Sequence, residues 1–138
     1  MQPQEIARAV DLVARILPVT LPQPMRTKLA RVMALLPMGL RTTAHMLVLL
    51  RRVAALMSPH GRTALRLDTW MTVVVALMVV GDKMTEDCET ALPEWAESFG
   101  MSAHDVSRAE GEVMTALNWD AHMDETALQN VLAEICVK

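Results

Sequence analysis

Hydrophobic residues recur at helical spacing along almost the whole chain. In the first such segment, 3–17, Ile6, Val10, Val13 and Leu17 share one face, and Pro18 then interrupts the pattern. No Asn-Gly or Asp-Gly turn separates two alternating apolar runs, which is the usual signal of a β-hairpin. The pattern therefore predicts an all-α chain.

The same criterion predicts six further helices. They are expected at 25–36, 41–57, 69–84, 93–99, 103–117 and 125–137. Asp68, Ser102 and Asp124 stand where N-caps of three of these helices would be, and 85–92 is expected to be an acidic loop. The helix at 69–84 is apolar on nearly every side, so we expect it to be the central one.

Length and composition favour one compact domain. The chain has 138 residues, of which 52% are hydrophobic and 21% charged, too apolar for intrinsic disorder. Its longest apolar run, 70–80, is well short of the roughly 20 residues that span a membrane, so no membrane contact is expected. Charged residues near the start argue against a signal peptide. We therefore expect a cytoplasmic and/or nuclear protein in which Cys88 and Cys136 are reduced.

Charge and motifs argue against nucleic-acid binding and catalysis. A net charge of −3 and 3% aromatic residues provide neither a basic stripe nor a stacking platform. No zinc-helix, phosphate-loop or nucleophile-elbow motif is present, and the acidic cluster at 82–89 lacks the pattern of a calcium loop. We expect no catalytic residue, no metal and no cofactor. A small helical enzyme that uses His104, Glu110 or Glu112 is the weakest hypothesis.

A series of short motifs comes after the predicted central helix in a fixed order. It reads KMTED at 83–87, WA at 95–96, GMS at 100–102, SRAEGEVM at 107–114 and LNWD at 117–120. This series resembles the cyclin box, particularly the single-box cyclins of the fungal phosphate-signalling and cyclin Y type. Upstream, LVLLRRV at 47–53 resembles the preceding box helix, and Arg31 stands where such cyclins often carry an arginine. The resemblance covers about 25–121.

The resemblance implies a five-helix cyclin box with a flanking helix at each end. The box would occupy 24–121, the N-terminal flanking helix and linker 1–23, and the C-terminal flanking helix 122–138. Four family positions differ: this chain has Gly81-Asp82 for Ala-Ala, Met71-Thr72 for His-Arg, Arg51-Arg52 for Asp-Arg and Ala121 for Leu. The polar contacts that brace the box must therefore differ from those of the family.

The resemblance also implies a function, the binding and activation of a cyclin-dependent protein kinase. A cyclin holds the αC helix of the kinase in its active position, which the Lys–Glu ion pair of the kinase requires. The family lysine and glutamate at this contact correspond to Lys83 and Glu110. The kinase-binding face is expected to include Met84, Glu86 and Met114 as well.

Other interpretations of the same residues stay open at this stage. Lys83 complements the dipole at the end of its helix, and it could form a purely structural ion pair with Glu110 or remain solvated. The chain could also be a cyclin-fold adaptor for a partner other than a kinase, and its few surface charges leave self-association open. Trp95 and Trp119 are expected in the core, as are most of the twelve methionines.

Overall fold

The computed structural model describes residues 1–36, 38–57, 66–85, 92–122 and 124–136. In these ranges the chain is entirely helical, as the hydrophobic pattern predicted. The helices are α1 (Pro3–Ile16), α2 (Gln23–Leu35), α3 (Leu40–Met57), α4 (Leu67–Thr85), α5 (Leu92–Ser98), α6 (Ala103–Ala116) and α7 (Glu125–Ile135).

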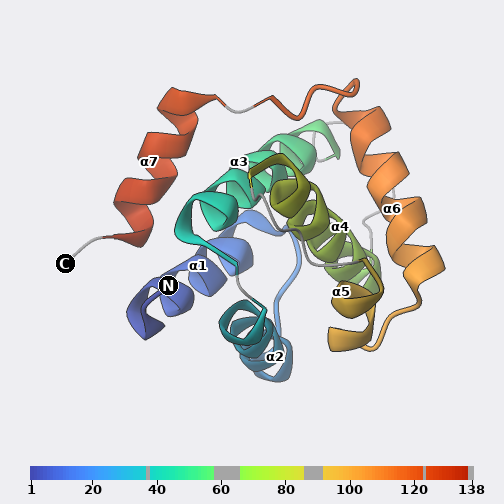
Figure 1. Ribbon diagram of the computed structural model, residues 1–138, viewed down its shortest axis with the longest axis horizontal. Helices are drawn as coiled ribbons and strands as arrows, with labels where there is room; N and C mark the ends of the chain where they lie inside the picture. The colour runs from blue at the N-terminus through green and yellow to red at the C-terminus, as the bar shows by residue number, and fades with distance from the viewer. Residues whose placement is uncertain (37, 58–65, 86–91, 123, 137–138) are drawn as a thin grey trace.

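Helices α3 and α4 form the middle of the molecule, with α6 and α7 on opposite edges (Figure 1). Helix α4 packs against α3, α5 and α6, while α3 packs against α1, α4, α6 and α7. Every residue from 42 to 50 of α3 is buried, and in α4 every residue from 70 to 82 except Thr72 is buried. The hydrophobic helix predicted as central is thus buried on several sides, but it shares that position with α3.

Gly81 marks a close approach of α4 to α3. A Cβ atom at this position would lie 3.3 Å from the carbonyl oxygen of Thr42 and 3.6 Å from the Cβ of Met46. The missing side chain therefore lets the end of α4 lie directly against the start of α3. Gly111 on α6 is different, because a Cβ there would meet no atom within 4 Å.

Two of the three predicted N-caps are confirmed. The Ser102 hydroxyl accepts a hydrogen bond from the Asp105 amide at the start of α6, and the Asp124 carboxylate accepts one from the Ala127 amide at the start of α7. The prediction for Asp68 was wrong, because α4 begins at Leu67 and Asp68 lies in its first turn. Of the predicted acidic loop, the two ends belong to α4 and α5, and 86–91 lie outside the described residues.

Arginines of α1 and α3 attach the C-terminal part of the chain. Arg51 pairs with Glu134 of α7 at 3.0 Å, and Arg8 of α1 donates to the Ile135 carbonyl at 2.9 Å. Arg52 donates to the Asp120 carbonyl at 2.9 Å and so holds the segment between α6 and α7. Arg51 and Arg52, which replace the Asp-Arg of the cyclin pattern, therefore both bind the part of the chain beyond α6.

His45 is a buried link between α3 and this same segment. Its side chain is fully buried, and its Nε2 lies 3.0 Å from the Ala121 carbonyl oxygen. A carbonyl can only accept, so Nε2 carries the proton, and the buried Nδ1 has no hydrogen-bond partner among the described residues. Burial lowers the pKa of His45, and the nearby charges of Arg41 and Arg52 lower it further, although the bond to Ala121 acts in the opposite direction.

The two tryptophans expected in the core behave differently. Trp95 is 1% exposed and confirms the prediction. Trp119 is 69% exposed, so the prediction for it was wrong. It lies past the end of α6, where Asn118 and Trp119 both have positive φ angles, of 53° and 60°. The chain turns sharply there and directs the ring outward.

Methionine fills much of the core, as the composition suggested. The fully or nearly fully buried methionines are Met33, Met38, Met46, Met71 and Met78. Cys136 is an exposed free thiol near Glu5, whereas Cys88 lies outside the described residues. Within the described ranges, no helix is both long enough and apolar enough to cross a membrane.

The two glycines predict opposite responses to a larger side chain. Gly111→Ala should raise the free energy of unfolding by about 0.5–1 kcal/mol, because alanine favours the helix and meets no neighbour. Gly81→Val should lower it by about 1–3 kcal/mol through overpacking against α3. Urea denaturation measures both, and a stabilised Gly81→Val variant would contradict the close approach.

His45 predicts a loss of stability in acid. An unfolded histidine titrates at about pH 6.5, and the folded-state pKa is lower. As the pH falls below about 6.5, the unfolded chain gains a proton that the folded chain resists, so the free energy of unfolding decreases. Urea denaturation between neutral pH and about pH 5 should show a steeper decrease for the wild type than for His45→Gln. His104→Gln, at an exposed position, serves as the control and should retain the wild-type slope.

Candidate functional site

Lys83 and Glu110 lie together on the surface where α4 packs against α6. Lys83 is in the last turn of α4 and Glu110 is in the middle of α6. The Lys83 Nζ is 2.9 Å from the Glu110 Oε1, so the two side chains form an ion pair. The Lys83 side chain is 46% exposed and that of Glu110 19%. The internal pair that the sequence allowed is thus formed in this chain.

Rigid packing fixes the position of this pair. Val106, Ala109 and Val113 of α6 are buried, and they hold the helix against the core on either side of Glu110. Two residues before Lys83, Gly81 lies against α3. Both charged residues therefore project from backbone that has little freedom to shift.

The other expected members of the face differ in their exposure. Met84 comes directly after Lys83 and is 54% exposed, so it offers an apolar contact beside the ion pair. Met114 is one turn after Glu110 but is partly buried and packs against the core. Glu86 lies outside the described residues. We call the surface of Lys83, Met84 and Glu110, with the exposed part of Met114, the α4–α6 face.

The ion pair is a weak fastener. Exposed pairs contribute about 0–1 kcal/mol to stability, because water screens the charges and ordering the side chains costs entropy. The position of Lys83 at the end of α4 adds a favourable interaction with the helix dipole. A partner carboxylate could therefore replace Glu110 as the ligand of Lys83 at small cost.

Sequence reasoning missed the exposure of Trp119. The signal that could have shown it is the preceding Asn118, because asparagine adopts left-handed backbone more readily than most residues and commonly marks a turn. An aromatic residue just after such a turn need not continue the buried face of the helix.

Metal and catalytic chemistry find little support in the described part of the chain. No three or more His, Cys, Asp or Glu side chains gather there in a way that could hold a metal ion. His104 and Glu112, the candidates of the enzyme hypothesis, are both exposed on α6. The α4–α6 face is suited to contact with another macromolecule.

Comparisons of this chain with protein-family models, with curated protein sequences and with solved structures found no match.

The ion pair predicts a small coupling energy. In a double-mutant cycle of Lys83→Ala and Glu110→Ala, we expect coupling below about 1 kcal/mol, measured by urea denaturation. The equivalent cycle for Asp11 and Arg26, the exposed pair between α1 and α2, should give a similar value. A coupling above about 2 kcal/mol would mean that the pair is a structural element that a partner could not use.

Proposed function

We propose that the chain is a cyclin-like regulatory subunit that binds a cyclin-dependent protein kinase through its α4–α6 face and activates it. The observation that carries this proposal is the placement of Lys83 and Glu110. They correspond to the family residues at the kinase contact, and they come from separate helices to lie 2.9 Å apart on one surface. The exposed Met84 beside them supplies apolar area.

The helix order is compatible with the proposal. In the resemblance, the five box helices correspond to α2, α3, α4, α5 and α6, and the third box helix is the buried one. Helices α1 and α7 then correspond to the flanking helices, and both pack against α3, away from the α4–α6 contact. This arrangement leaves the face uncovered by the described flanking helices.

Activation would need no chemistry from this chain. A kinase is active when the αC glutamate pairs with the β3 lysine, and a partner that binds only that arrangement shifts the equilibrium toward it. A rigid surface is suited to this task, because it does not adapt to the inactive position of αC. The packing of α4 and α6 around Lys83 and Glu110 provides such rigidity.

The second candidate is a cyclin-fold adaptor that binds a protein other than a kinase. The observation that favours it is the internal pairing of Lys83 with Glu110, which satisfies both charges without a partner. The buried Asp82 also departs from the family alanine at the end of α4. In this case the α4–α6 face would contribute to stability and binding would use another surface.

One experiment separates the two candidates. Tagged full-length chain is used to recover partners from an extract of its native cells, and kinase activity is measured in the eluate with and without an inhibitor of cyclin-dependent kinases. We expect inhibitor-sensitive activity with the wild type and at least a tenfold loss, about the effect of one hot-spot pair, with Lys83→Ala/Glu110→Ala.

Asp11→Ala/Arg26→Ala is the matched control. It removes an exposed ion pair between two helices on another part of the molecule and should retain the activity. Circular dichroism should show that all three proteins are folded. Activity that survives in the Lys83/Glu110 variant would refute the proposed face, and a wild-type eluate without inhibitor-sensitive activity would favour the adaptor.

A further inference from the structure

Charge is strongly divided between the two halves of this sequence. From Leu12 to Leu67 the chain contains nine Lys and Arg and no Asp or Glu, whereas residues 68–138 contain 14 Asp and Glu against three Lys and Arg. Several of these opposite charges meet inside the fold, as in the pairing of Arg51 with Glu134. The basic part nevertheless keeps cationic side chains at its surface.

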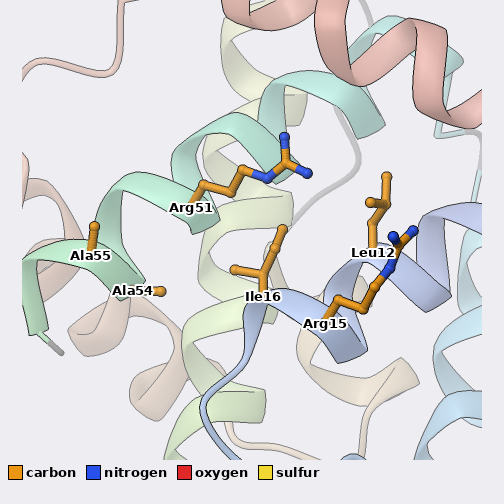
Figure 2. Close-up of a pocket in the computed structure, with 6 residues that line it drawn as sticks. All are labelled: Leu12, Arg15, Ile16, Arg51, Ala54 and Ala55. Carbon is orange, nitrogen blue, oxygen red and sulfur yellow. The ribbon is translucent and has the colours of Figure 1, made fainter.

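One of these cationic side chains lies at an open groove between α1 and α3. The groove has a volume of about 490 Å³ and is lined by Leu12, Arg15, Ile16, Arg51, Ala54 and Ala55. Figure 2 shows the two arginines toward the same side as Leu12, with the two alanines at the other end and Ile16 between the helices. Arg15 has no ion-pair partner among the described residues. The groove therefore combines an apolar floor with a positive rim.

The acidic part of the chain carries a side chain of complementary character. Trp119 is 69% exposed, and it is held outward by backbone with a φ of 60°, a conformation that tryptophan seldom adopts. Asp120 and Asp124 are close to it in sequence and are exposed. An exposed tryptophan on strained backbone is typical of a binding element, because such strain is concentrated at functional sites and tryptophan is a common interface anchor.

We propose that the chain self-associates by insertion of Trp119 of one copy into the α1–α3 groove of a second copy. The groove has room for an indole ring, which would lie against Ile16, Ala54 and Ala55. Arg15 would then lie near both the ring face, which attracts a cation, and the carboxylates that accompany Trp119. The opposite charges of the two halves favour this pairing over contact between two like surfaces.

The contact joins two different patches, so each copy offers one tryptophan and one groove. Such contacts form rings or chains when the two patches cannot be exchanged within a single pair. One side chain in one groove buries less area than a standard stable interface, so we expect micromolar or weaker association.

Sedimentation equilibrium of the purified full chain over a wide concentration range tests the proposal. The wild type should associate, and Trp119→Asn should weaken association at least tenfold, the effect of losing an anchor residue. Asparagine tolerates positive φ better, so this variant should be at least as stable to urea as the wild type. Leu35→Ala removes another exposed hydrophobic side chain and should associate like the wild type.

A mixing experiment tests whether the two patches meet each other. Ala55→Glu places a charged side chain in the groove, and Arg15→Glu is a second variant that reverses the charge at its rim. Trp119→Asn and Ala55→Glu should each be monomeric, yet their mixture should form a one-to-one dimer from the intact groove of one and the intact tryptophan of the other.

Three results would overturn the proposal. The first is a wild type that stays monomeric up to millimolar concentration. The second is a Trp119→Asn variant that associates like the wild type. The third is a mixture of the two defective variants that forms no complex although the wild type associates.

Discussion

The close packing of α3 against α4 is the contact on which the rest of this structure depends. Both helices are buried over most of their length, so each needs the other to remove its apolar surface from water. Gly81 sets their spacing, because the Thr42 carbonyl lies where a larger side chain would be. Helices α1 and α7 are then arranged on α3, and α5 and α6 on α4.

Polar side chains decide how the C-terminal part joins this pair of helices. His45, Arg51 and Arg52 of α3 contact the Ala121 carbonyl, Glu134 and the Asp120 carbonyl. Each contact joins residues far apart in the sequence, and together they fix both the segment after α6 and helix α7. The buried histidine makes this attachment sensitive to protons, whereas the exposed ion pairs make it sensitive to salt.

The sequence allowed the helices to be predicted but gave less information about the surface. Spacing of apolar residues located all seven helices of the described ranges to within a few residues, because burial of one face determines each of them. The margin position of Glu110 was also predictable from the same spacing, and its pairing with Lys83 was one of the alternatives it allowed. The share of α3 in the centre was not, because arginines on its outer side lower the apparent hydrophobicity of a helix that is buried elsewhere.

Trp119 shows why the surface was harder to predict. Its burial was expected from residue type, but a turn with two positive φ angles directs it to solvent. Such a turn depends on where the α6 helix ends, and helix ends are the least certain feature of a sequence pattern. The groove between α1 and α3 was invisible for a related reason, since it is formed by residues whose contact depends on tertiary packing alone.

The positions of the two chain ends have a practical meaning for attached groups. Both ends lie on the same side of the molecule, with α6 on the far edge (Figure 1). The contact of Arg8 with the Ile135 carbonyl keeps the first and last helices adjacent. A label or a fused domain joined to either terminus would therefore extend from the α1–α7 side and leave the region around Lys83 and Glu110 accessible.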